Sequence, residues 1–182
     1  MATTDPQPLS PLRPLQRHIT AHNDKSEAIF SDAIPAEAPV RSVMGGDMEF
    51  SLMFTTSKFP VSMNDDKDLE GYKGYLKTPP AIVIPGGTVC RTVDFPPGYA
   101  SPMHRTVSLD FGVVLEGEIE LILDSGETRT LKRGDVAVQR GTNHAWRNKS
   151  TETWGRMLYV LQSSEEVMVN GKALELDEGG ID

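Results

Sequence analysis

The second half of the chain is built from short segments in which apolar and polar residues alternate between glycine turns, and this pattern constrains the fold most strongly. In residues 118–124, Ile119, Leu121 and Leu123 fall on one face of a strand and acidic residues fall on the other. A Ser-Gly pair then forms a tight hairpin turn. Strands of this kind, repeated at intervals of about 8–12 residues, predict an all-β sandwich or barrel with antiparallel pairing.

The expected strands are spread over the chain from residue 48 onward. They cover residues 48–56, 87–95, 103–115, 118–124, 127–131, 136–139, 144–148 and 154–162. Residues 81–85 add a short β-branched run. Residues 62–74 are polar and charged, and we expect a surface loop there, because no segment shows a helical period of useful length.

The chain has 182 residues, which is the size of one ordinary domain. Residues 1–14 hold four prolines and are expected to form a flexible, extended arm. Residues 15–47 are expected to pack on the barrel, which then spans residues 48–178. Residues 179–182 are expected to form a disordered tail.

Composition and charge exclude several classes of partner. The formal net charge of −8 argues against a nucleic-acid partner, because phosphates are bound by basic surfaces. The single cysteine, Cys90, excludes an intrachain disulfide framework and a cysteine-rich zinc site. No apolar run approaches the ~20 residues of a membrane helix, and the N-terminus does not resemble a secretory signal. We therefore expect a cytoplasmic protein that binds neither nucleic acid nor membranes.

Polar side chains alternate along the expected strand 103–115. His104, Thr106, Ser108 and Asp110 share one face of that strand. An apolar core does not accept such a row unpaired, since each unpartnered polar group costs about 1–3 kcal/mol. The face must be solvated, hydrogen-bonded or wrapped around a metal ion. With His144 from a later strand, it supplies the parts of a two-histidine, one-carboxylate metal site.

Two stretches of the sequence resemble the two motifs of the cupin superfamily. The first is Gly98-x5-His104-x-Thr106-x3-Asp110-x6-Gly117, and the second is Gly134 followed by Gly141-x2-His144-x3-Asn148. The resemblance implies a double-stranded β-helix, or jelly-roll, barrel with a metal pocket in its mouth.

The sequence departs from the family pattern in three places. Thr106 replaces a histidine, Asp110 replaces a glutamate, and Gln139 replaces a proline, with one residue fewer before it. The resemblance then implies His104, Asp110 and His144 as the catalytic ligands of a divalent metal ion: zinc, iron, manganese or nickel. The alternative is a metal-free, hydrogen-bonded pocket.

Four further residues are predicted to bind substrate, namely Arg91, Thr106, Ser108 and Trp146. Arg91 lies between two valines on its strand. It either faces the pocket and binds a substrate carboxylate, or faces the surface and leaves the alternate positions to the core. Trp146 shares the face of His144, so it is either a stacking wall of the pocket or a core residue.

The resemblance and the site together predict a metal-dependent enzyme that acts on a small organic acid, a phenol or an enolisable carbonyl compound. The expected reaction is a lyase-type decarboxylation, a dehydration or an isomerisation, in secondary metabolism or aromatic catabolism. Two alternatives are an Fe(II)-dependent dioxygenase with the same ligands and a non-catalytic cupin that binds a small molecule. We expect a homodimer, because exposed sheet edges need protection and the N-terminal arm can add a strand to a neighbouring subunit.

Overall fold

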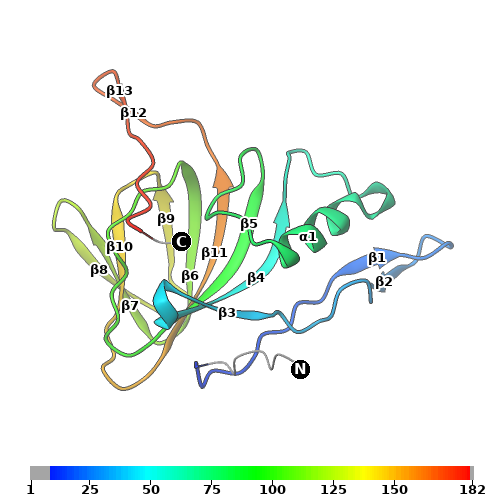
Figure 1. Ribbon diagram of the computed structural model, residues 1–182, viewed down its shortest axis with the longest axis horizontal. Helices are drawn as coiled ribbons and strands as arrows, with labels where there is room; N and C mark the ends of the chain where they lie inside the picture. Colours follow the sequence, from blue (N-terminus) through cyan, green and yellow to red (C-terminus); the bar gives the residue numbers. More distant parts are fainter. Residues whose placement is uncertain (1–8, 181–182) are drawn as a thin grey trace.

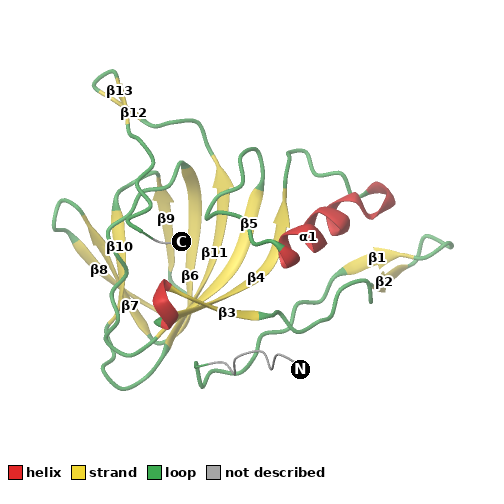
Figure 2. Ribbon diagram, viewed as in Figure 1, coloured by secondary structure: helices red, strands yellow, loops and turns green. Residues whose placement is uncertain are grey.

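The structure, a computed structural model, describes residues 9–180. It confirms the predicted all-β barrel, in which a six-stranded and a three-stranded antiparallel sheet curve around a common interior (Figures 1 and 2). In sheet order, the larger sheet contains β3 (Val40–Val43), β4 (Met48–Thr56), β5 (Thr88–Phe95), β11 (Gly155–Ser163), β6 (Ser108–Glu116) and β9 (Val136–Arg140). The smaller sheet contains β10 (His144–Asn148), β7 (Glu118–Leu123) and β8 (Thr128–Lys132).

The remaining elements are short and lie around the barrel. They are the hairpin β1 (Thr20–His22) and β2 (Ala28–Phe30), the 3-10 turns η1 (Met44–Gly46) and η2 (Asn64–Asp66), the helix α1 (Lys67–Lys77), and the hairpin β12 (Met168–Val169) and β13 (Lys172–Ala173). Figure 1 shows α1 beside β4 and the β1–β2 hairpin extending away from the barrel. Among the described residues, no helix is long and apolar enough to cross a membrane.

The apolar positions of the alternating strands form the core. Val89, Val93 and Phe95 of β5 pack inside the barrel against Ile119 of β7 and Met157 of β11. The strands at 48–56 and 144–148 begin and end as predicted, and five others agree to within about one residue at either end. The period-2 pattern predicted them well because strands such as β6 and β9 bury alternate residues, although β5 is buried on both faces from residue 91 to residue 95.

The surface loop predicted at residues 62–74 is wrong, since most of this stretch belongs to η2 and α1. Leu69 and Tyr72 lie three residues apart on one face of α1 and are fully buried in a second small core. The Tyr72 ring packs on Phe54 of β4, with ring centroids 4.8 Å apart, and its hydroxyl donates to the carbonyl of Leu52 at 2.5 Å. Charged residues and two glycines dilute the helical pattern, so the helix depends on the sheet that it covers.

Two other strand predictions also need correction. The strand predicted at 103–115 begins only at Ser108, because His104 pairs with His144 and Arg105 with Asp177 in isolated bridges outside the sheet. Residues 81–85 form no strand. The carbonyl groups of Ala81 and Ile82 instead accept hydrogen bonds from the Arg91 side chain.

The N-terminal segment is held against the outside of the barrel from residue 9 onward. The backbone amides of Leu9 and Ser10 donate to the Glu49 carboxylate at 2.5 and 2.9 Å. Arg156, which forms a buried ion pair with Asp94, also donates to the carbonyl of residue 13 at 2.9 Å. The predicted flexible arm at residues 1–14 therefore makes specific contacts over residues 9–13, and residues 1–8 lie outside the described part of the chain, as do residues 181–182 of the predicted tail.

Candidate functional site

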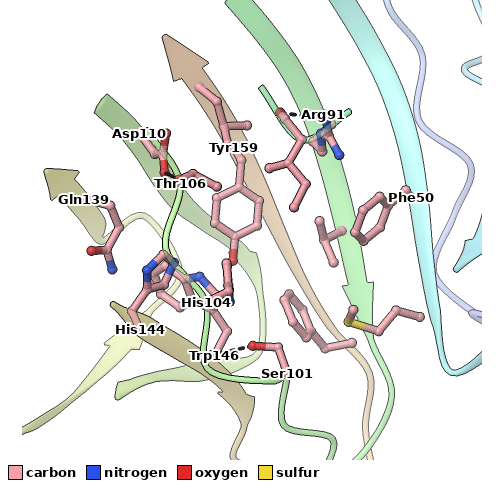
Figure 3. A pocket seen from close by; sticks show the side chains of 15 residues that line it. Phe50, Arg91, Ser101, His104, Thr106, Asp110, Gln139, His144, Trp146 and Tyr159 are labelled. Carbon is pink, nitrogen blue, oxygen red and sulfur yellow. Dashed lines mark hydrogen bonds between the residues drawn. The ribbon is translucent and has the colours of Figure 1, made fainter. Parts of the chain in front are cut away.

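A cavity of about 70 Å³ lies inside the barrel, and we name it the inner cavity (Figure 3). Residues from both sheets line it, and most of its wall is apolar. Its polar lining consists of Arg91, Ser101, His104, Thr106, Asp110, Gln139 and His144. Aromatic rings of Phe50, Phe95, Trp146 and Tyr159 line it as well. The structure thus brings the predicted site residues to one place, with the exception of Ser108.

The two histidines predicted from the motifs are neighbours in the inner cavity. Their backbones are paired by two hydrogen bonds, and their ring centroids lie 4.3 Å apart. Nδ1 of His104 lies 3.0 Å from the carbonyl oxygen of Pro102, and Nδ1 of His144 lies 2.9 Å from that of Thr142. A carbonyl oxygen only accepts hydrogen bonds, so Nδ1 carries the proton on each ring and Nε2 carries the lone pair.

Burial keeps both imidazoles neutral. It lowers the pKa of His144 to about 4, with a further contribution from the neighbouring His104 and an opposing one from the hydrogen bond to Thr142. Burial also lowers the pKa of His104, against the opposing hydrogen bond to Pro102. At neutral pH the pair therefore presents two hydrogen-bond acceptors rather than two cations.

Asp110 stands in a separate hydrogen-bonded chain at the end of the cavity. Ser108 Oγ donates to Thr106 Oγ1 at 2.8 Å, and Thr106 Oγ1 donates to Asp110 Oδ2 at 3.3 Å. Asp110 Oδ1 is buried and has no hydrogen-bond partner among the described residues. Burial raises the pKa of Asp110 to about 6, although the bonds from Ser108 and Thr106 and the charge of Arg91 act in the opposite direction.

The predicted substrate contacts of this stretch have different roles. Thr106 lines the inner cavity and holds Asp110, whereas Ser108 lies behind Thr106 and supports it. The four residues do not share one strand face, because only Ser108 and Asp110 lie on β6. His104 and Thr106 reach the same interior from the segment before β6.

The three predicted metal ligands do not come together in this structure. Asp110 lies with Thr106 on one side of the cavity, apart from the two imidazole rings (Figure 3). Over residues 9–180, no three side chains of His, Cys, Asp or Glu are close enough together to hold a metal ion. A catalytic zinc site usually has three protein ligands, so the arrangement does not fit the predicted ligand set of two histidines and one carboxylate. Metal binding stays a prediction from the resemblance.

Arg91 faces the cavity, which decides between the two orientations that its sequence context left open. Its Nη2 donates to the carbonyl oxygens of Ala81 and Ile82 at 3.0 and 2.9 Å, and its guanidinium carbon lies 5.5 Å from the centre of the Phe50 ring. Its Nε is buried, and no group within residues 9–180 accepts a hydrogen bond from it. Burial lowers the pKa of Arg91 to about 10, against the opposing charge of Asp110, so the side chain is still a cation at neutral pH.

Trp146 and Tyr159 form aromatic walls of the cavity. The Trp146 ring meets His144 and Tyr159 edge to face, with centroids 5.6 and 5.5 Å away. Burial raises the pKa of Tyr159 well above its usual value, so its hydroxyl stays neutral and donates to the sulfur of Met157. Trp146 is therefore a wall of the pocket and part of the core at the same time.

Gln139 is the site residue that sequence reasoning missed. It lies opposite Asp110 in the pairing of β9 with β6. Its Oε1 accepts a hydrogen bond from Thr142, while its Nε2 is buried and has no partner in the described part of the chain. The sequence of β9 gives no signal for this position, because the apolar residues Val136 and Val138 are exposed while Ala137 and Gln139 are buried. The resemblance marks the residue only as a substitute for the proline of the second motif.

Comparison with known proteins agrees with this architecture. Residues 91–161 match the family model described as "Cupin domain". The chain is 50% identical to phomopsin biosynthesis cluster protein D of Diaporthe leptostromiformis, over 90% of this chain and 86% of the relative. It is 40% identical to the cupin-domain-containing oxidoreductase virC of Hypocrea virens, over 90% of this chain and 83% of the relative.

A solved structure supports the fold. The cupin domain of Cnp3 from Schizosaccharomyces pombe superposes with a TM-score of 0.50 at 13% identity, over 82% of this chain and 88% of that one. This likeness confirms the jelly-roll barrel implied by the two motifs. With a matching cupin domain and close relatives over most of its length, the chain belongs to the cupin superfamily.

Proposed function

We propose that this cupin is an enzyme of secondary metabolism that moves a proton on a compound with an enolisable carbonyl group, in an isomerisation, a dehydration or a decarboxylation. The relatives named for a biosynthesis cluster and as oxidoreductases support an enzymatic role. The observation that carries the reaction type is a set of unpartnered polar atoms in one apolar cavity. These are an acceptor on Asp110 and donors on Arg91 and Gln139.

Asp110 is the general base in this proposal. A base works best when its pKa lies near the working pH, and the pKa of Asp110 is raised to about 6. At pH 7 the carboxylate is largely ionised, and Oδ1 is free to accept a proton from the carbon next to a carbonyl group. Thr106 fixes the other oxygen and so orients the carboxylate.

The negative charge that develops on the substrate oxygen needs donors. Arg91 supplies a cation with an unpartnered Nε, and Gln139 supplies an unpartnered amide N–H across from Asp110. Fixed donors in a water-poor cavity stabilise an enolate strongly. The proton on Asp110 then returns to another carbon in an isomerisation, or protonates the leaving hydroxyl in a dehydration. In a decarboxylation the carbon dioxide leaves first, and a protonated Asp110 supplies the proton to the resulting enolate.

The histidine pair has a different role from the base. Each Nε2 carries a lone pair, so the pair accepts hydrogen bonds from a hydroxyl group of the substrate, such as a phenol or an enol. The same two nitrogens are the atoms that a divalent metal ion would take. Metal analysis of protein purified without chelators, with His104→Ala and His144→Ala as comparisons, tests that prediction.

Proton exchange in deuterium oxide tests the proposed reaction directly. The full-length protein is incubated with 3-oxo acids and 1,3-diketones, and loss of the acidic C–H signal is followed by NMR. The wild type is expected to accelerate exchange or decarboxylation, and Asp110→Asn is expected to lose that acceleration by about 10²–10⁴-fold. Equal rates for the two proteins would show that Asp110 is not the base.

Oxidation is the second candidate, because the relative virC is named an oxidoreductase. A dioxygenase with iron would need a third ligand beside the two imidazoles, which the described residues do not bring there, and it would consume oxygen during turnover. Oxygen uptake that depends on added Fe(II) and on both histidines, but not on Asp110, would favour this reaction over proton transfer.

A further inference from the structure

A second and larger cavity, of about 340 Å³, adjoins the inner cavity, and we name it the outer groove. It lies between α1, β3, β4 and the irregular residues 79–82. Its apolar wall includes Val43, Leu52, Tyr75, Leu76, Pro79 and Pro80. Both cavities are lined by Phe50, Ile82 and Arg91, so they meet at these three side chains.

The inner cavity alone is too small for most ligands. A water-sized group takes up about 15 Å³ by this measure, so a volume of about 70 Å³ holds about five such groups. That is enough for a carbonyl or carboxylate group with its adjoining carbons. Ligand sites usually measure about 300–1,000 Å³, and this site reaches that range only when the outer groove is included.

Arg91 stands where the two cavities meet. Its side chain is only 8% exposed, and its unpartnered Nε offers one more hydrogen bond. A buried cation of this kind suits a carboxylate or carbonyl oxygen. Farther out, the outer groove is lined by one cation, Arg41, and one carboxylate, Glu178, whose formal charges cancel, so the buried guanidinium of Arg91 is where the two cavities favour a negative charge.

We propose that the substrate is an elongated, amphipathic compound that occupies both cavities. Its carbonyl or carboxylate end lies in the inner cavity with an oxygen held by Arg91, and its apolar body lies in the outer groove. The placement of the reacting end in the inner cavity rests on the proposed function. The binding of an apolar body in the outer groove does not require turnover, so it is tested separately.

Calorimetric titration with straight-chain carboxylates, from butanoate to decanoate, tests the outer groove. The affinity of the wild type is expected to rise about fourfold for each methylene group that enters the groove. Ser42→Trp places a large side chain at an exposed position that lines the outer groove. This substitution is expected to weaken the affinity for decanoate at least tenfold and to leave the affinity for butanoate unchanged. Thr128→Trp, at an exposed position on β8 outside both linings, is the matched control and keeps the wild-type series.

Arg91→Lys tests the role of Arg91, which lies where the two cavities meet. It keeps a cation but removes the Nε donor, so it should weaken every acid by a similar factor and leave the dependence on chain length intact. The proposal is overturned if no carboxylate binds, if affinity does not depend on chain length, or if Ser42→Trp keeps the wild-type series.

Asp110→Asn separates this inference from the proposed function. It is expected to lose proton exchange and to keep the dependence of affinity on chain length. If the affinity of the wild type depends on chain length but no proton exchange occurs, the proposed function is wrong and binding of an apolar body in the outer groove is supported. If proton exchange occurs but affinity does not depend on chain length, the proposed function is supported and the proposal of binding in the outer groove is wrong.

Discussion

Replacing Asp110 with asparagine should stabilise the protein at neutral pH. The side chain is 4% exposed, and burial raises its pKa from an ordinary value of 3.8 to about 6. Between these two pH values the folded state binds more protons at this site than the unfolded state does. The contribution of Asp110 to stability therefore falls as the pH rises from about 4 to about 6, and it stays low above that window.

The pKa shift sets the size of the effect. Each pKa unit corresponds to about 1.4 kcal/mol, so the shift of about two units makes the ionised carboxylate cost roughly 3 kcal/mol at pH 7. Asparagine keeps the shape and stays neutral. For a chain of this size a gain of about 3 kcal/mol corresponds to a rise in Tm of roughly 6–12 °C.

Thermal unfolding of both proteins between pH 3 and pH 8 measures this effect. The difference in Tm should be near zero at pH 3.5 and reach its full size above pH 6.5. Asp32→Asn, at an exposed position, is the matched control and should shift the free energy of unfolding by less than about 0.5 kcal/mol at any pH. A lower Tm for Asp110→Asn at pH 7 would refute the reasoning, because it would mean that the ionised carboxylate is stabilised in the folded protein.

Three further predictions concern the fold and the assembly. Deleting residues 1–14 should lower the Tm by several degrees, because Glu49 and Arg156 lose backbone partners at residues 9–13; an unchanged melting curve would show that these contacts contribute nothing. Tyr72→Phe should cost about 1 kcal/mol of unfolding free energy through the lost hydrogen bond to β4, and Tyr72→Ala about 3–5 kcal/mol through the cavity it leaves; equal costs from chemical denaturation would argue against the packing described for α1. Light scattering should give the mass of a homodimer. Val138 is exposed on β9, the edge strand of the larger sheet, so Val138→Lys should shift the mass toward that of the monomer. A wild-type protein that is monomeric at all concentrations would rule out the dimer.

The barrel could be predicted from the sequence because its strands are half-buried. In β7, Glu118 is exposed and Ile119 is fully buried, as the period-2 pattern predicts, although Glu120 is buried as well. The same logic fails for α1. Tyr72 and Leu69 become an apolar stripe only against the surface of β4, which no local pattern reveals.

The site was only partly predictable for a related reason. The motif spacing indicated His104, Asp110 and His144, and all three line the inner cavity. A shared strand face predicted that His104 and Asp110 lie close together, but His104 precedes β6 and pairs with β10 instead. Gln139 was not proposed as a site residue, because its role follows from the pairing of two strands and not from its own neighbours in the sequence.

The pKa of Asp110 in the folded protein tests the central claim most directly. Carbon-13 NMR of protein labelled at the aspartate carboxyl groups can follow each titration, and the resonance missing from Asp110→Asn identifies the one that matters. We predict a midpoint near pH 6, because burial raises the pKa of this carboxylate, whose Oδ1 is free of hydrogen bonds from the described residues. A pKa in that range suits a general base at neutral pH. A midpoint below 4 would contradict the account, because Asp110 would then be too weak a base for the proposed proton transfer.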